Sequence, residues 1–196
     1  MPPDNFDYEN FELTISADKG IENADKAGVK PDVLVGDFDS SSAKGAKEVI
    51  RYPAEKDVTD TEIAVDYAIS KGAEEIMIFG GTGGRADHSM ANIMLLARTA
   101  KKGIDIKMLD GTNLFFVTLK SLEVKKQGFK YMSLFPLFGD VENLTLSGVK
   151  YPLDSYLLKC DSSLCVSNEI EMDKAVITFS AGALLIVLSE PDTNLG

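Results

Sequence analysis

The sequence has few of the residues that most often mark a zinc site or a membrane segment. It contains two cysteines, Cys160 and Cys165, and a single histidine, His88. The cysteine spacing matches no common zinc arrangement and no histidine stands near it, so we expect reduced structural thiols. No apolar run approaches the roughly 20 residues that cross a bilayer as a helix. These absences argue against a zinc protein and against a transmembrane helix.

Basic residues are also in the minority. The 196 residues include 20 Lys and Arg against 31 Asp and Glu, which gives a net charge of −11. This balance argues against nucleic acid as a partner, because phosphate backbones require a basic surface. An acidic protein that binds an acidic substrate needs local cations, either Arg and Lys side chains or a metal ion. The N-terminus lacks the basic region and apolar core of a secretory signal, so we expect a cytoplasmic location.

The first two-thirds of the chain alternates short apolar runs with helical patterns. The predicted strands are Leu13–Ala17, Val33–Val35, Val49–Tyr52, Glu75–Phe79 and Ile106–Leu109. A helix is predicted from Thr59, because Thr59 and Glu62 fit a capping box, and another from Asp87 to Lys102. Alternation of this kind indicates βαβ units and a mostly parallel sheet.

From about Asn113 the pattern changes to short strands separated by turn signals. The strands predicted there are Leu114–Leu119, Tyr131–Phe135, Val141–Leu146, Cys165–Glu169, Lys174–Phe179 and Leu184–Leu188. Such spacing favours an antiparallel sandwich or partial barrel. We therefore expect an α/β domain at residues 1–112 and an all-β sandwich at residues 113–196.

Aspartates follow the predicted parallel strands at the point where each strand ends. They are Asp18, Asp37, Asp39, Asp60 and Asp87. Ligands of open parallel sheets bind at the carboxyl ends of the strands, so these side chains are expected to converge. Mg²⁺ takes hard oxygen ligands and bridges phosphate oxygens, which predicts a magnesium site that handles a polyphosphate. Each aspartate alone also has a structural interpretation, as a turn residue or a helix cap.

The segment Gly80–His88 is the most specific single signal. Four glycines in five residues precede a predicted helix, whose N-terminal amides attract anions. Arg85 offers a forked donor for phosphate oxygens. The segment is neither a P-loop nor a G-x-G-x-x-G motif. A single histidine at a helix start, such as His88, is more often structural than a base, and a Ser-His-Asp triad would lack its nucleophile elbow.

At these residues the sequence resembles the thiamine pyrophosphokinase family, over nearly the whole chain. The segments that carry the resemblance are Ala17–Gly20, Pro31–Asp32, Gly36–Ser40, Lys56–Asp60, Gly83–His88 with Asn92, Gly148–Leu153 and Ser167–Glu169. Any one of them is a weak signal, and together they are highly specific.

The resemblance implies transfer of the β,γ-pyrophosphoryl group of ATP to the hydroxyl of thiamine, which gives thiamine diphosphate and AMP. It implies an ATP-binding catalytic domain, a thiamine-binding β-sandwich, and a homodimer with thiamine bound between subunits. It assigns Mg²⁺ to Asp37, Asp39 and Asp60, which with Asp87 form the catalytic set, and the proton acceptor is left open between Asp37 and Asp87. The implied ATP-side residues are Asp18, Lys56, Thr59, Gly83, Gly84, Arg85, Asp87 and His88. The implied thiamine-side residues are Tyr151, Ser167 and Asn168.

Two features depart from the family pattern. Family members usually begin with an additional apolar strand and a glycine-rich turn, whereas this chain begins Met1-Pro2-Pro3-Asp4. We therefore expect the parallel sheet to lack that first strand. Lys19 stands where a second glycine is more usual.

Three alternatives remain open from the residues alone. A related pyrophosphokinase acting on a hydroxymethylpterin would share the aspartate pattern. A phosphatase with an aspartyl-phosphate intermediate would also place Asp37-Phe38-Asp39 after an apolar strand. The third is a nucleotide-binding or thiamine-sensing module without catalysis.

Overall fold

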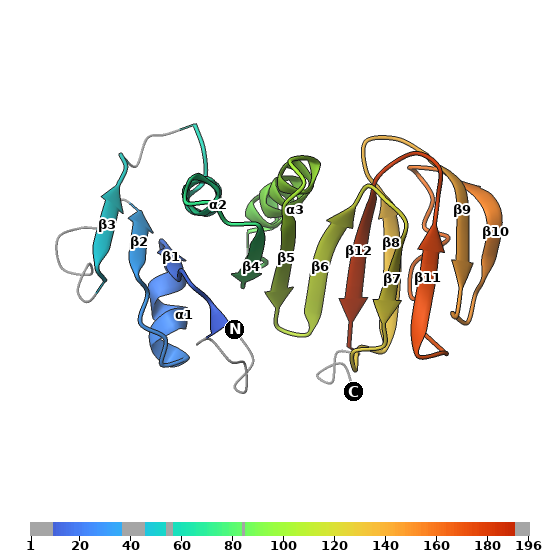
Figure 1. Ribbon diagram of the computed structural model, residues 1–196, viewed down its shortest axis with the longest axis horizontal. Coiled ribbons are helices and arrows are strands. Elements are labelled where there is room, and N and C mark those ends of the chain that lie inside the picture. Colours follow the sequence, from blue (N-terminus) through green and yellow to red (C-terminus); the bar gives the residue numbers. More distant parts are fainter. Residues whose placement is uncertain (1–9, 37–45, 54–56, 84, 191–196) are drawn as a thin grey trace.

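The computed structural model describes residues 10–36, 46–53, 57–83 and 85–190. Within these residues the strands form three sheets, and the helices lie in the first half of the chain (Figure 1). The helices are α1 (Gly20–Lys26), α2 (Asp60–Ser70) and α3 (Ala86–Lys101). The strands are β1 (Ile15–Ala17), β2 (Val33–Gly36), β3 (Glu48–Arg51), β4 (Glu75–Phe79), β5 (Asp105–Asp110), β6 (Asn113–Thr118), β7 (Leu122–Lys125), β8 (Tyr131–Pro136), β9 (Val141–Ser147), β10 (Leu153–Leu158), β11 (Lys174–Thr178) and β12 (Leu184–Ser189).

The first sheet is short and parallel, in the order β1-β2-β3. Its central strand β2 is a run of apolar residues, and Val33, Leu34 and Val35 are almost completely buried. A continuous apolar run of this kind is typical of a parallel strand covered on both faces. Ile63 and Ala64 of α2 pack on this sheet.

The second sheet has the order β4-β5-β6-β12-β8 and mixes parallel and antiparallel pairs. β4 and β5 pair in parallel, whereas β5 and β6 form an antiparallel hairpin. The parallel strands are therefore divided between two sheets, where the sequence predicts one mostly parallel sheet. Among the described residues, the free edges of β1 and β4 form no ladder with each other. The predicted boundary at 112/113 lies in the β5–β6 turn, inside one continuous sheet.

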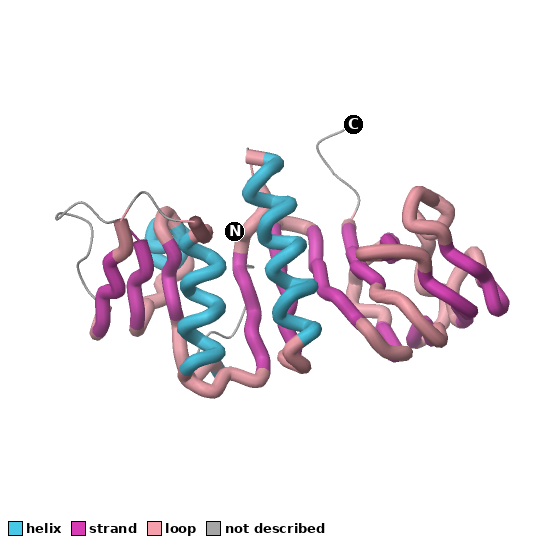
Figure 2. Tube along the Cα trace, turned by 90° about the horizontal axis from the view of Figure 1, so that it is seen from above, coloured by secondary structure: helices cyan, strands magenta, loops and turns pink. Residues whose placement is uncertain are grey.

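The two long helices α2 and α3 lie side by side (Figure 2). Arg98 of α3 contacts Glu62 and Asp66 of α2, and Lys102 contacts Asp66. The contacts advance in the same direction along both helices, so their N-termini point to the same side. None of the described helices is both long enough and apolar enough to cross a membrane.

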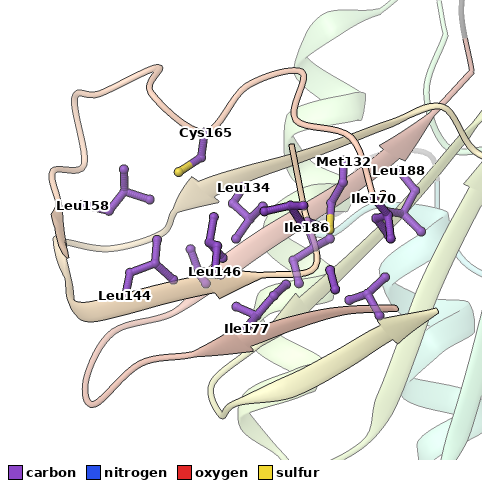
Figure 3. Close-up of a cluster of buried hydrophobic side chains, with 14 of the residues drawn as sticks. Met132, Leu134, Leu144, Leu146, Leu158, Cys165, Ile170, Ile177, Ile186 and Leu188 are labelled. Carbon is purple, nitrogen blue, oxygen red and sulfur yellow. The ribbon is translucent and has the colours of Figure 1, made fainter. Parts of the chain in front are cut away.

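The third sheet, β10-β9-β11-β7, packs against β6, β8 and β12 to form a β-rich half. Their shared core contains aliphatic side chains from both sheets, among them Leu144, Leu146, Ile177, Leu134 and Ile186 (Figure 3). All five are at most 1% exposed. Alternation of buried and exposed residues along β9 and β11 produces this one-sided burial.

Most predicted elements are present, with shifts of one or two residues at their ends. Two strands were not predicted: β7 alternates apolar and charged residues but has only four residues, and β10 shows no alternating pattern. The predicted strand Cys165–Glu169 is wrong. These residues form a turn that lies against β8, where Met132 and Asn168 make an isolated bridge and the Leu134 N–H donates to the Cys165 carbonyl. The sequence also predicts a helical stretch from about Ser42, which begins among residues outside those that the structure describes.

Candidate active site

The N-terminus of α2 is capped by Thr59. Its Oγ1 accepts a hydrogen bond of 3.2 Å from the Glu62 N–H, which is the first half of the predicted capping box. The Glu62 carboxylate lies 2.9 Å from Arg98 Nη1. Glu62 thus links α2 to α3. Asp60 is the first residue of α2, which follows β3 in the chain, and it is half-exposed.

The glycine-rich segment leaves β4 and is bonded at three successive residues. The Gly80 N–H donates to the Leu109 carbonyl (2.9 Å), and Asn92 Nδ2 donates to the Gly81 carbonyl (2.7 Å). The Thr82 N–H donates to the Asp110 carboxylate (2.6 Å), and the Thr82 hydroxyl bonds the same oxygen. This part of the segment is therefore held to β5 and α3 rather than being a loose loop.

Arg85 and Asp87 form a two-bond ion pair at the N-terminus of α3. Arg85 Nη2 lies 2.5 Å from Asp87 Oδ2, and Nε donates to Oδ1 at 3.1 Å. The guanidinium lowers the pKa of the Asp87 carboxyl from 3.8 to about 2. Both side chains are largely exposed, so the guanidinium stands at the surface where an anion can reach it. The next residue, His88, donates its backbone N–H to Asp87 Oδ1, and its side chain is exposed.

Asp18 follows β1 in a left-handed backbone conformation, with φ of +47°. Its N–H donates to the Val35 carbonyl of β2 (2.8 Å), which turns the chain toward α1. An L residue rarely adopts this φ, and aspartate is one of the residue types that tolerate it best. A Cβ built on Gly80 would lie 3.9 Å from the Asn23 side chain of α1, so the exit of β4 lies near the helix that follows Asp18.

Only part of the predicted metal set can be placed. Asp37 and Asp39 lie outside the described residues, as do Lys56 and Gly84. Among the residues that are described, no three acidic, histidine or cysteine side chains come together as a metal cluster. Asp60 is described, at the N-terminus of α2.

The three predicted thiamine-side residues are brought together in the β-rich half. The side chain of Asn168 is 3% exposed and forms a reciprocal pair with the Tyr151 backbone. Its Oδ1 accepts the Tyr151 N–H (3.0 Å), and its Nδ2 donates to the Tyr151 carbonyl (2.9 Å). Ser167 is exposed with φ of +59°, and its N–H donates to Ser133 Oγ at 3.0 Å. Asn168 thus supports the backbone of Tyr151. The Tyr151 side chain faces solvent, since the residue is 59% exposed.

Sequence reasoning missed two residues that organise this site. In the sequence the dipeptide Asp110-Gly111 is a turn signal, yet the Asp110 carboxylate bonds Thr82 across 28 positions of sequence. Arg98 was one helix residue among many, yet it joins α3 to α2. A local signal was available for Asp110, since it ends a predicted parallel strand as the other aspartates do.

Both halves of the chain match models of one protein family. Residues 8–108 match the thiamin pyrophosphokinase catalytic domain, and residues 120–184 match the thiamin pyrophosphokinase vitamin B1 binding domain. The thiamine pyrophosphokinase of Bacillus subtilis is 37% identical over 187 residues, covering 90% of this chain and 87% of that protein.

Solved structures agree with the sequence matches. The crystal structure of the Bacillus subtilis thiamine pyrophosphokinase superposes with a TM-score of 0.85 at 35% identity, covering 94% of this chain and 91% of the other. A thiamin pyrophosphokinase family protein from Enterococcus faecalis gives a TM-score of 0.86 at 30% identity, with coverage of 96% and 93%.

The fold and the two matched parts define a two-part transferase, with an α/β catalytic half followed by a β-rich substrate-binding half. The chain belongs to the thiamine pyrophosphokinase family. The reaction of this family transfers pyrophosphate from ATP to thiamine and yields thiamine diphosphate and AMP.

Proposed function

We propose that this chain catalyses that reaction with ATP bound at the N-termini of α2 and α3 and thiamine bound beside Tyr151. The observation that carries the proposal is the Arg85–Asp87 pair, an exposed guanidinium held at a helix N-terminus directly after a glycine-rich segment. Helix N-terminal amides and a forked guanidinium together suit the oxygens of a polyphosphate. The ATP-side set comprises Asp18, Lys56, Thr59, Gly83, Gly84, Arg85, Asp87 and His88.

Mg²⁺ is proposed as the required ion, held by Asp37, Asp39 and Asp60. The described member of this set fits the ion, because Asp60 supplies a half-exposed carboxylate next to the proposed phosphate site. When bound, the ion would neutralise charge on the phosphate oxygens. The protein's own part is to place the thiamine hydroxyl in line with the β-phosphorus, since positioning supplies much of the acceleration in such transfers.

Asp87 fits an anchoring role better than that of a proton acceptor. Its pKa of about 2 makes the carboxylate a weak base near neutral pH. Two hydrogen bonds to Arg85 also occupy both of its oxygens. We therefore propose that Asp87 orients the guanidinium, and that Asp37 is the better candidate to accept the hydroxyl proton.

A homodimer is proposed because one chain keeps its two sets of residues apart. In Figure 1, α2 and α3 lie in the left and central parts of the long axis, whereas β9 and β10, which border the thiamine side, lie at its far right end. Exposed apolar side chains cluster in sequence around β10, namely Tyr151, Tyr156, Leu157, Leu164 and Val166. We propose that these side chains contribute to an apolar interaction surface. A second subunit covering it would complete each site.

The two free thiols suit a reducing compartment, so we also propose a cytoplasmic location.

The reaction is tested by incubating the protein with ATP, Mg²⁺ and thiamine and detecting thiamine diphosphate and AMP by mass spectrometry. Asp39→Ala and Asp60→Asn are expected to abolish product formation, whereas Asp173→Asn, at an exposed residue before β11, keeps it. A pterin alcohol in place of thiamine is expected to give no product. Tight ATP binding without turnover would instead support a nucleotide-binding module, and a trapped phospho-aspartate would support a phosphatase.

The shared site is tested by mixing two inactive variants, Arg85→Ala and Ser167→Ala. If each site combines residues from two subunits, a mixed dimer contains one intact site. Equal mixing is then expected to restore roughly a quarter of the wild-type activity. Mixing that restores nothing, although light scattering shows exchanged dimers, would contradict a site built from two subunits.

A further inference from the structure

Asp110 lies at the carboxyl end of β5, directly beside the segment that leaves β4. One carboxylate oxygen, Oδ2, accepts both the backbone N–H and the hydroxyl of Thr82. Asp110 is half-buried, which reduces competition from water for these bonds. A charged acceptor makes stronger hydrogen bonds than a neutral one. Thr82 is therefore the most strongly held residue of the segment.

The bonds of Gly80 and Gly81 show what the Asp110 contact adds. Gly80 is fixed by the β5 backbone and Gly81 by Asn92 of α3. Beyond Thr82, the Gly83 N–H makes a longer bond of 3.4 Å to Ser89 Oγ. Among Gly80–Gly83, the described residues of the segment, Asp110 thus holds the last one that makes a short hydrogen bond. Glycines lose more backbone freedom on ordering than other residues, so a glycine-rich segment needs such external bonds to keep one conformation.

We propose that Asp110 is a positioning residue for the ATP site, acting through Thr82 to fix the segment that presents Arg85 to the polyphosphate. The inference rests on the proposed role of Arg85. Asp110 itself does not touch substrate in this account. Its contribution is to restrict the conformations of Arg85 and the α3 N-terminus before ATP binds. Less conformational entropy is then lost on binding.

A positioning role and a purely electrostatic role predict opposite effects of the same substitution. A carboxylate near a polyphosphate repels it, so charge alone would make Asp110→Asn bind ATP more tightly. The amide introduced by Asp110→Asn would retain a neutral acceptor and hold Thr82 less strongly. Weaker ATP binding in Asp110→Asn therefore supports positioning.

The experiment measures KM for ATP and for thiamine in Asp110→Ala, Asp110→Asn, Thr82→Val and Thr82→Ser. We expect Asp110→Ala and Thr82→Val to raise the KM for ATP about tenfold, with Asp110→Asn intermediate. The KM for thiamine is expected to stay within about twofold, and Thr82→Ser, which keeps the hydroxyl, to resemble wild type. Asp32→Ala is the matched control, because Asp32 also accepts a backbone N–H and a side-chain donor, at the start of β2.

A second readout does not depend on activity. Arg85 is followed by Ala86, so trypsin can cleave there once the segment is released. Cleavage after Arg85 is expected to be about tenfold faster in Asp110→Ala than in Asp32→Ala. Adding ATP with Mg²⁺ is expected to slow it in wild type. This readout remains informative if Asp110→Ala loses all turnover.

The outcomes separate this inference from the proposed site. If Arg85→Ala weakens ATP binding but the Asp110 and Thr82 variants match wild type in KM and in cleavage, the positioning role is overturned and the site stands. If Arg85→Ala leaves the dissociation constant for ATP, measured by isothermal titration calorimetry, unchanged, the proposed ATP site is wrong. Equal rises in both KM values for Asp110→Asn would indicate a general loss of structure and would also overturn the inference.

Discussion

Gly81 adopts a backbone conformation that other residues avoid, with φ of +105°. A Cβ at this position would lie 2.6 Å from Met108 Sδ and 3.3 Å from Asn92 Nδ2. Met108 is completely buried, so its side chain has little room to move. Both the backbone conformation and the packing therefore require glycine at position 81. Its presence in this glycine-rich segment does not need to be explained by flexibility.

Gly81→Ala is expected to destabilise the protein by about 1–3 kcal/mol, through strain at positive φ and the displaced Met108. Chemical denaturation with urea measures this loss. Gly20→Ala is the control, because a Cβ there meets nothing within 4 Å and φ is ordinary. We expect it to be neutral or slightly stabilising. Equal effects of the two substitutions would show that the Gly81 environment is not restrictive.

The Arg85–Asp87 pair predicts a pH dependence with a definite sign. The pKa of Asp87 is lowered to about 2 by Arg85, so the pairing is fully present above the unperturbed pKa of 3.8 and is lost as pH falls through about 2. Arg85→Gln is expected to return the pKa toward 3.8. Carboxyl NMR at pH 3 should then show Asp87 ionised in wild type and mostly protonated in the variant.

Asp32 provides the internal reference for that measurement. Its pKa is lowered by a hydrogen bond from Lys47, which Arg85 does not touch. The Asp32 signal is expected to be the same in both proteins. An unchanged Asp87 signal in Arg85→Gln would mean that the pair does not persist in solution.

At the scale of elements, Arg98 holds α2 and α3 together. Nη1 lies 2.9 Å from Glu62 and Nη2 2.8 Å from Asp66, and the Arg98 side chain is 37% exposed. Its Nε is buried without a hydrogen-bond partner, which offsets part of the gain. These ion pairs between α2 and α3 matter for the proposed site. The N-termini of the two helices carry Thr59, Asp60, Arg85 and Asp87.

Arg98→Met is expected to lower the free energy of unfolding by about 1 kcal/mol, since partly exposed ion pairs contribute little individually. Thermal unfolding followed by circular dichroism measures the change. Lys174→Met, which removes a single pair of 2.7 Å to Glu123, is the control and should cost less than about 0.5 kcal/mol. A larger loss in the control than in Arg98→Met would contradict the linking role of Arg98.

At the scale of the whole molecule, one sheet joins the two halves that the family models separate. β4 and most of β5 lie in the catalytic match and β8 lies in the vitamin B1 binding match, while β6 lies between the two matches and β12 begins where the second ends. Phe115 and Val117 of β6 pack on the core that contains Leu95 and Leu96 of α3. The halves therefore share hydrogen bonds and buried surface, and we expect them to unfold together.

Leu96→Ala tests this coupling. Leu96 is completely buried, so the substitution should cost about 2–5 kcal/mol. Hydrogen exchange should show faster opening of β9 and β11 amides as well as of the helices. Leu119→Ala is the control, because Leu119 is 43% exposed. It is expected to lower the free energy of unfolding by less than about 0.5 kcal/mol. Unchanged exchange in β9 and β11 would show that the halves unfold independently.

Local patterns in the sequence predicted most elements and the family. The capping residue Thr59, the apolar strand β2 and the alternation in β9 depend on neighbouring residues, so each can be recognised without the fold. The family resemblance also came from short segments, and the comparisons confirm it. β10 and the wrongly predicted strand at Cys165–Glu169 lack a clear pattern, because their conformation depends on contacts with β9 and β8.

The sequence by itself determined which residues bear charge, where most helices and strands lie, and that aspartates follow the parallel strands. The tertiary structure decided how the strands are divided between sheets, that Asp110 bonds Thr82, and that Arg98 joins α2 to α3. The physical reason is the separation along the sequence between the residues that interact. Capping and periodicity act within a few residues, whereas a hydrogen bond across 28 positions exists only after packing brings its partners together.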